Sequence, residues 1–157
     1  TTDYFYRLNN KNIYDIMIHN NIYYILSEVG LILFDGKNHT FKDISNKQFN
    51  NIEINNNQII LSRDNKLYKL INNEKLELIM QYENIINFDI CEDYIWMHNK
   101  NNALIYNINS SSRIEYDSED GILGNIIYDL ACNKNWVWFN TNNGISFYNW
   151  RQFHNEK

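Results

Sequence analysis

The chain has 157 residues and a formal net charge of -5, and 44% of its residues are hydrophobic. It is long enough to bury a globular core, and it contains no apolar run of about 18 residues, the length that a membrane helix needs. Its 14 basic residues form no basic stripe, and Arg63, Lys69 and Lys75 are interpreted as isolated, solvated side chains. We therefore expect no nucleic-acid partner.

The composition favours β-structure. Asparagine occurs 30 times and isoleucine 24 times, and proline is absent. Asparagine readily adopts the left-handed backbone conformation of tight turns, whereas isoleucine and the aromatic residues favour strands. We therefore expect short strands that are joined by Asn-rich turns.

Taken in chain order, apolar runs of strand length occur in four groups of four. The centres of the second runs, Tyr24, Ile60, Trp96 and Trp138, are 36, 36 and 42 residues apart. The runs are too short and too often interrupted by Asn for helical repeats. The four groups are 13–18, 22–26, 30–35 and 39–44; 49–54, 58–62, 66–71 and 75–80; 85–90, 94–98, 103–108 and 112–116; and 126–131, 136–140, 144–149 and 150–154.

Four short strands repeated at this period are typical of β-propeller blades. The sequence therefore predicts an all-β fold, a β-propeller segment of about four four-stranded blades. One more strand-like run, at 3–8, belongs to none of the groups, which favours part of a larger propeller of the seven-bladed type over a closed four-bladed ring. The predicted domains are an outer strand of a preceding blade at 1–12, followed by blades at 13–48, 49–84, 85–125 and 126–157.

The last repeat carries a more specific pattern. It opens with Asp-Gly-Ile at 120–122, continues with Val137, Trp138 and Thr141 in its central strand, and ends with Gly-Ile-Ser-Phe-Tyr at 144–148. This pattern resembles the repeat of the two-component regulator propeller family, with Asn140 at a position where that repeat has glycine. The other three groups keep the spacing and fewer of the motif residues.

The resemblance implies a role in signalling. Proteins with these repeats are typically the periplasmic sensing regions of membrane-anchored bacterial histidine kinases, often hybrid ones, which detect products of polysaccharide breakdown. It therefore implies a ligand-sensing region with an oligosaccharide ligand, a periplasmic location and no catalysis within this chain. The alternatives are a fragment of a propeller-type glycan hydrolase or lyase, and a protein-binding propeller scaffold.

No residue pattern indicates catalysis or metal binding. Glycosidases need two carboxylates that converge, and the acidic residues at 92–93, 117 and 119–120 fall in links between strands, where solvated roles are ordinary. The sequence also lacks the motifs of activated nucleophiles and phosphate-binding loops. We therefore predict no cofactor and no metal. The histidines lie in four different groups without the spacing of metal ligands, at His19, His39, His98 and His154.

The four tryptophans divide into two pairs. Trp96 and Trp138 occupy the same position in their groups, which favours packing between blades over binding of a ligand. Trp136 and Trp150 break the repeat pattern, so we predict that they are exposed, and they are the candidate ligand-binding residues for stacking on a sugar.

Two features concern the stability of the blades. Cys91 and Cys132 are predicted to pack as small buried hydrophobic residues, with a bridge between them left open as an alternative. The first and last blades of a repeat array expose apolar faces that a neighbour would cover. We therefore expect self-association through the blades.

Overall fold

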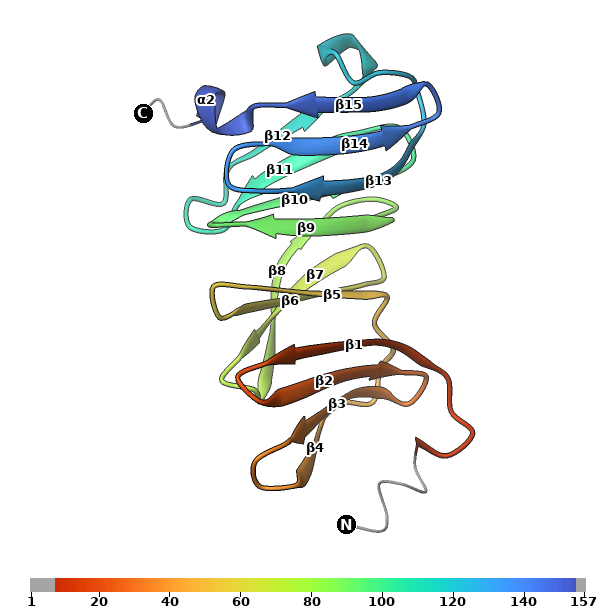
Figure 1. Ribbon diagram of the computed structural model, residues 1–157, viewed down its shortest axis with the longest axis vertical. Helices are drawn as coiled ribbons and strands as arrows, with labels where there is room; N and C mark the ends of the chain where they lie inside the picture. The colour runs from red at the N-terminus through yellow and green to blue at the C-terminus, as the bar shows by residue number, and fades with distance from the viewer. Residues whose placement is uncertain (1–7, 155–157) are drawn as a thin grey trace. The chain divides into compact units, whose positions relative to one another are not determined.

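The computed structural model describes residues 8–154. These residues divide between two compact units, unit 1 up to Gln81 and unit 2 from Tyr82 onwards. Each unit contains two antiparallel sheets in which strands adjacent in sequence are paired (Figure 1). The predicted all-β fold of propeller-type blades is confirmed. The strand expected at 3–8 lies, apart from Leu8, outside the described residues.

Unit 1 holds the first and second sheets, each with four strands in sequence order. All eight strands start and end within two residues of the predicted runs. The first sheet consists of β1 (Ile13–His19), β2 (Ile22–Ser27), β3 (Gly30–Asp35) and β4 (Thr40–Ser45), and the second of β5 (Asn51–Asn55), β6 (Gln58–Arg63), β7 (Lys66–Ile71) and β8 (Lys75–Gln81).

Unit 2 holds the third and fourth sheets, which have four and three strands. A short 3-10 helix, η1 (Ser118–Asp120), lies between them in sequence, and a helix, α2 (Trp150–His154), follows the last strand. The third sheet consists of β9 (Asn87–Cys91), β10 (Tyr94–His98), β11 (Ala103–Asn107) and β12 (Arg113–Tyr116), and the fourth of β13 (Ile127–Cys132), β14 (Val137–Thr141) and β15 (Gly144–Tyr148).

The prediction of a strand at 150–154 is wrong, because this segment forms the helix α2. The Asn149 side chain accepts a hydrogen bond from the Gln152 backbone N–H (3.3 Å), the contact that an N-cap residue makes. The Trp150 side chain is buried and its indole Nε1 donates to the Asn133 carbonyl (3.1 Å). A five-residue run is too short for periodicity to distinguish a strand from a helical turn.

Asparagine has the role in turns that its abundance indicates. In four hairpins, both central turn residues have φ between 47° and 63°. Two consecutive residues with positive φ are the mark of the type I′ turn, whose twist matches that of the paired strands. The turn pairs are Asn20–Asn21, Asn56–Asn57, Asp64–Asn65 and Asn72–Asn73.

Hydroxyl groups hold the turns of two other hairpins. Thr141 Oγ1 donates to the Gly144 carbonyl (2.8 Å) between β14 and β15, and Ser27 Oγ donates to the Gly30 carbonyl (3.1 Å) at the equivalent turn of the first sheet. Gly30 and Gly144 both have φ near +120°, a region that L-residues avoid. The Thr and Gly of the family-like repeat are therefore residues that shape the hairpin.

A separate apolar core lies between the two sheets of each unit. In unit 1, Tyr24, Leu26, Leu31 and Leu33 of the first sheet pack with Ile52, Ile59, Leu61 and Leu70 of the second, and with Phe49. In unit 2, Trp96, Ala103 and Ile105 of the third sheet pack with Ile127, Leu130, Val137 and Phe139 of the fourth, and with Trp150.

A disulfide joins the two sheets of unit 2. It connects Cys91, at the end of β9, to Cys132, at the end of β13. The prediction that both cysteines are unpaired hydrophobic residues is wrong, and the alternative of a bridge is correct. The two residues are 41 positions apart and become neighbours only when the third and fourth sheets pack.

Candidate functional site

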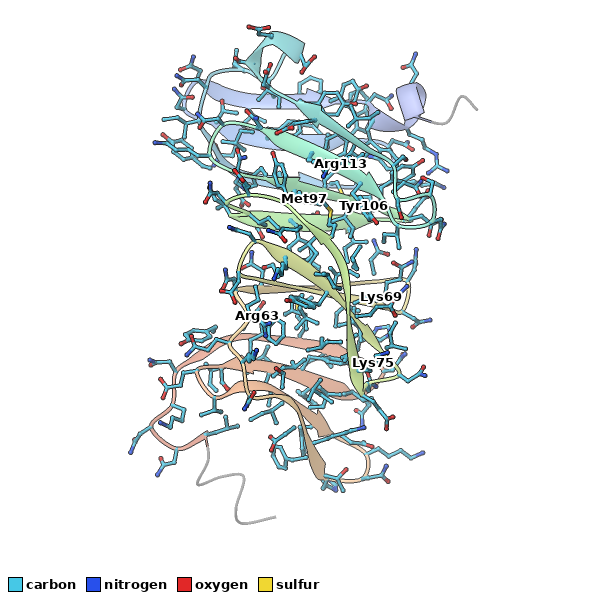
Figure 2. All side chains as sticks on the ribbon, turned by 180° about the vertical axis from the view of Figure 1, so that it is seen from behind. Arg63, Lys69, Lys75, Met97, Tyr106 and Arg113 are labelled. Carbon is cyan, nitrogen blue, oxygen red and sulfur yellow. A yellow bond between two sulfur atoms is a disulfide. The ribbon has the colours of Figure 1, made fainter. Side chains whose placement is uncertain are left out.

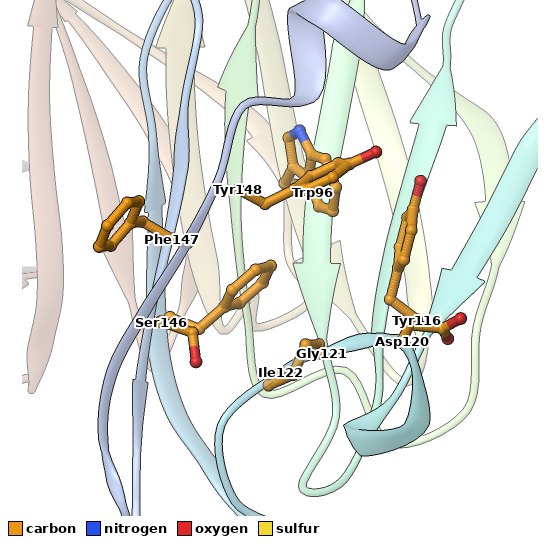
Figure 3. A pocket seen from close by; sticks show the side chains of 9 residues that line it. Trp96, Tyr116, Asp120, Gly121, Ile122, Ser146, Phe147 and Tyr148 are labelled. Carbon is orange, nitrogen blue, oxygen red and sulfur yellow. The ribbon is translucent and has the colours of Figure 1, made fainter.

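An aromatic pocket of about 60 Å³ opens in unit 2 beside the core. Figure 3 shows its side chains, which come from β10, β12, η1 and its C-terminal link, β14 and β15. Trp96 is fully buried, whereas Tyr116 and Tyr148 are half-buried. The lining residues are Trp96, Tyr116, Asp120, Gly121, Ile122, Phe139, Ser146, Phe147 and Tyr148.

The rings of this pocket lie edge to face or tilted against one another. The centroid of Trp96 is 5.7 Å from that of Tyr116, 5.9 Å from that of Phe139 and 6.4 Å from that of Tyr148. These separations are within the range of favourable aromatic pairs. The indole Nε1 of Trp96 is buried and has no hydrogen-bond partner among residues 8–154. An unpaired buried donor raises the free energy of the folded state, and an acceptor that reached this N–H would remove that cost.

Polar groups surround the aromatic rings. A hydrogen bond links Tyr116 to Tyr148, and burial is the main reason why the pKa of Tyr116 lies well above its ordinary value, so that its hydroxyl stays neutral. Ser146 Oγ accepts a hydrogen bond from the Leu123 N–H (2.6 Å). Asp120 Oδ2 accepts one from the Asp117 N–H (3.1 Å), part of the capping box of η1. The pocket therefore combines flat apolar faces with fixed polar atoms.

A second aromatic surface lies on the outer face of the fourth sheet. Trp138 and Phe147 are cross-strand partners with ring centroids 5.2 Å apart, and they are 42% and 59% exposed. Ile145, on the same face, is 66% exposed. A groove of about 190 Å³ runs between Trp138, Ile145 and the outward-facing side chains of β13. Trp138 was expected to pack between two blades, but within the described residues no second blade covers it.

The two tryptophans predicted to be exposed differ in their surroundings. Trp136 is half-buried, and its ring lies 5.6 Å from that of Phe147. Trp150 is fully buried, and its ring lies 5.0 Å from that of Tyr94. The prediction of an exposed Trp150 is wrong, because the turn into α2 directs the side chain into the core. Binding of a ligand by Trp136 stays a prediction.

Three of the acidic residues considered for catalysis, Glu92, Asp117 and Asp120, have structural partners. Glu92 Oε1 accepts a hydrogen bond from Arg151 (2.6 Å), and Asp117 Oδ1 accepts one from the Glu119 N–H (2.7 Å). Within residues 8–154, no three His, Cys, Asp or Glu side chains lie close enough together to hold a metal ion. No helix in that range is long and apolar enough to cross a membrane.

Among the basic residues, Arg63, which is labelled in Figure 2, departs from the expectation of a solvated side chain by its burial. Only 17% of its side chain is exposed. Its guanidinium lies 5.3 Å from the ring centroid of Phe49 and 5.1 Å from that of Tyr68, distances at which a cation and a ring attract each other. It also donates to the Tyr68 hydroxyl (3.2 Å). Arg63 is therefore part of the packing of unit 1.

His98 is the one histidine among the buried residues of the described chain. Its Nδ1–H donates to the Asn99 carbonyl (2.9 Å), and its Nε2 has no hydrogen-bond partner among the described residues. Burial lowers the pKa of His98 below the ordinary value of 6.5, partly offset by that hydrogen bond and by Asp129. The folded state therefore disfavours the protonated imidazole.

We expect this histidine to make unit 2 less stable in acid. A depressed folded-state pKa gives stability that is present above the unfolded pKa and is lost as the pH falls below about 6.5. Thermal unfolding followed by tryptophan fluorescence between pH 5 and pH 8 measures this loss. In His98→Gln the loss of stability between pH 8 and pH 5 should be smaller than in the wild type. Equal losses would contradict the role given to His98 in the acid sensitivity of unit 2.

Comparison with known proteins shows which solved structures share this fold. No protein-family model and no curated protein matches the chain. Among solved structures, the extracellular domain of the putative one component system BT4673 from B. thetaiotaomicron matches 88% of this chain with a TM-score of 0.71 and 18% identity. The extracellular domain of the putative hybrid two component system BT3049 from the same organism matches 87% with a TM-score of 0.62 and 17% identity.

These likenesses are of fold. The N-terminal domain of Nup159 is similar to nearly the same degree, with a TM-score of 0.67, 12% identity and coverage of 85% of this chain and 40% of that one. This chain spans 20% of the length of each of the two bacterial domains. The blade architecture is therefore shared, at low identity, with proteins of different kinds.

The aromatic pocket was not predicted from the sequence. Asp120, Gly121, Ile122, Ser146 and Tyr148 were noted as residues of the family-like repeat, and all of them line the pocket. Their meeting with Trp96 and Tyr116 depends on packing between two blades. Both β12 and β15 end in a tyrosine, and this shared feature is the sequence signal that could have pointed to the pocket.

Proposed function

We propose that this chain is part of the extracytoplasmic, ligand-sensing propeller region of a two-component sensor histidine kinase. It recognises a glycan-derived ligand and carries out no catalysis itself. The observation that carries the proposal is the likeness in fold to extracellular domains of a putative one component system and of putative hybrid two component systems. The family-like repeat at residues 120–149 supports it independently, because it comes from the residues and not from the fold.

The Cys91–Cys132 disulfide supports the proposed compartment. Disulfides persist in the periplasm and outside the cell, and thiols are kept reduced in the cytosol. Both cysteines of the chain are used in this one bond. A bond that fastens two blades together fits a domain that folds after export.

The aromatic pocket supports the proposed ligand class. The rings of Tyr116 and Tyr148 present flat apolar surfaces, and the buried Nε1 of Trp96 is a donor with no acceptor in the described part of the chain. A sugar has apolar ring faces and carries hydroxyl oxygens that accept hydrogen bonds. Ligand pockets in general are lined by apolar and aromatic side chains with a few fixed polar groups.

The test is a thermal-shift and calorimetric screen of the purified chain against a panel of defined oligosaccharides. A ligand at about 100 times its dissociation constant stabilises the folded state by about 2.7 kcal/mol, so at least one oligosaccharide should raise the unfolding temperature. Tyr148→Ala should weaken its binding about tenfold or more, since a stacked ring face is lost. The matched control is Tyr128→Ala, an exposed tyrosine of β13 outside the pocket.

Two results would overturn the proposal. One is a panel in which no oligosaccharide binds at millimolar concentration. The other is a parent gene that encodes neither a membrane-spanning segment nor a histidine kinase. Binding that is unaffected by Tyr148→Ala would leave the sensing function standing and would remove the pocket as its site.

A further inference from the structure

The aromatic pocket of unit 2 is too small for a sugar ring. Its volume is about 60 Å³, whereas the apolar cavity that accommodates benzene, a ring of six atoms like that of a hexose, is roughly 150 Å³. The rings of Tyr116 and Tyr148 are half-buried, so part of each remains accessible. A sugar that binds here therefore lies across the opening, on these two tyrosines, and one substituent of a few heavy atoms enters the pocket.

The charge of the pocket restricts which substituent enters. Among the lining residues that the structure describes, Asp120 is acidic and none is a lysine, an arginine or a histidine. A carboxylate or sulfate substituent would meet a charge of its own sign, and like charges repel each other most strongly where water is partly excluded. The pocket therefore favours a neutral or a positively charged group over an anion.

The Asp120 carboxylate keeps the capacity to accept a hydrogen bond from a ligand. Its Oδ2 accepts from the Asp117 N–H (3.1 Å), and a carboxylate has about four lone-pair sites. Figure 3 shows its carboxyl group next to Tyr116. Burial is the largest cause of the raised pKa of Tyr116, and the charge of Asp120 is among the other causes. The negative charge that disfavours a tyrosinate in this pocket favours a cation there.

The aromatic rings favour a cation as well. The ring centroid of Tyr116 is 5.6 Å from that of Tyr148 and 5.7 Å from that of Trp96. An ammonium group within about 6 Å of a ring centroid is attracted to the face of the ring, and groups of such rings bind organic ammonium ions. Among the substituents that sugars carry, the amino group is the one that is both small and positively charged.

We propose that the aromatic pocket binds the ammonium group of an amino sugar, so that the ligand is an oligosaccharide that contains a hexosamine residue without an acetyl group. The ammonium group donates to the Asp120 carboxylate and lies against the rings of Tyr116 and Tyr148. This inference deepens the proposed sensing function and rests on it for the sugar, whereas the ammonium site rests on the pocket alone.

The experiment compares three oligosaccharides of the same linkage and length, made of glucosamine, N-acetylglucosamine or glucose, which differ in one substituent of each ring. Calorimetry should show the glucosamine oligomer binding at least about fivefold more tightly than the other two, because it alone places a cation against the rings. Asp120→Asn should abolish this preference while it keeps an oxygen that accepts from the Asp117 N–H. The matched control is Glu119→Gln, which removes the same charge from an exposed neighbour outside the pocket and should keep the preference.

A second measurement separates the ammonium site from the sensing function. Methylammonium, acetamide and acetate are titrated at equal ionic strength, and NMR follows the backbone N–H signal of Gly121, which lines the pocket. Methylammonium should shift this signal most, and Asp120→Asn should remove the difference between the three probes.

The outcomes distinguish the two proposals. A glucosamine oligomer that binds no more tightly than its acetylated or glucose counterpart overturns the amino sugar as ligand, and the sensing function stands if another oligosaccharide binds. A shift by methylammonium without binding of any oligosaccharide keeps the ammonium site and overturns the glycan ligand. A Gly121 signal that methylammonium leaves unchanged, or that acetate shifts as much, overturns the site itself.

Discussion

Reduction of the Cys91–Cys132 disulfide is expected to lower the free energy of unfolding of unit 2 by about 4 kcal/mol. The bond closes a loop between residues 41 positions apart, and a cross-link of this span removes conformational entropy from the unfolded chain. A loss of this size is a large fraction of the total stability of a small domain. The third and fourth sheets should therefore be the part of the molecule most sensitive to reductant.

Tryptophan fluorescence measures this effect selectively. All four tryptophans lie in unit 2, so a urea titration followed by fluorescence reports on the sheets that the disulfide joins. The titration is carried out with and without a thiol reductant. The matched control is the double variant Cys91→Ala/Cys132→Ala, which should be weakened to a similar degree and should not respond to the reductant.

A thiol assay tests the bond itself. The native protein should show no free thiol, and two should appear after reduction, because the chain has two cysteines. Free thiols in protein purified from the periplasm, or an unchanged urea midpoint after complete reduction, would contradict the structural role given to this bond.

Replacement of Trp150 is the second change with a large expected effect. Trp150→Ala removes a fully buried side chain from the core of unit 2, and truncations of this kind cost about 3–5 kcal/mol. The loss includes the contact with Tyr94 and the hydrogen bond from Nε1 to the Asn133 carbonyl. Urea unfolding followed by far-UV circular dichroism measures it.

The matched control is Trp138→Ala. Trp138 is 42% exposed on the outer face of the fourth sheet, and substitutions at such positions change stability by about 0.5 kcal/mol or little more. The comparison is made at a protein concentration at which both variants are monomeric. Equal costs for the two substitutions would show that Trp150 is not the core residue that the structure describes.

The strand pattern was predictable because it is local. An alternation of apolar and polar residues, a period of 36 to 42 residues and Asn-rich turns are properties of short stretches of chain. The positive φ angles at Asn56 and Asn57 confirm this reading of the turns. The one strand that failed, at 150–154, follows an asparagine that caps a helix, a signal that was available in Asn149.

The roles of the aromatic residues were not predictable in the same way. Trp96 and Trp138 occupy equivalent positions, yet Trp96 is buried and Trp138 is exposed. The difference lies in whether another sheet covers them, and no property of either strand encodes that. Arg63 was likewise predicted to be a solvated cation. In the structure its guanidinium packs against the rings of Phe49 and Tyr68, which its own strand does not reveal.

The sequence by itself determined the blades: their number within the described chain, the order of their strands and the turns that connect them. These follow from backbone preference and from hydrophobic pattern, which act over a few residues. Only the tertiary structure decided that Cys91 meets Cys132, that Trp150 is buried and that Tyr116, Tyr148 and Trp96 form a pocket. Each of these depends on two sheets packing face to face, and the residues involved are far apart in sequence.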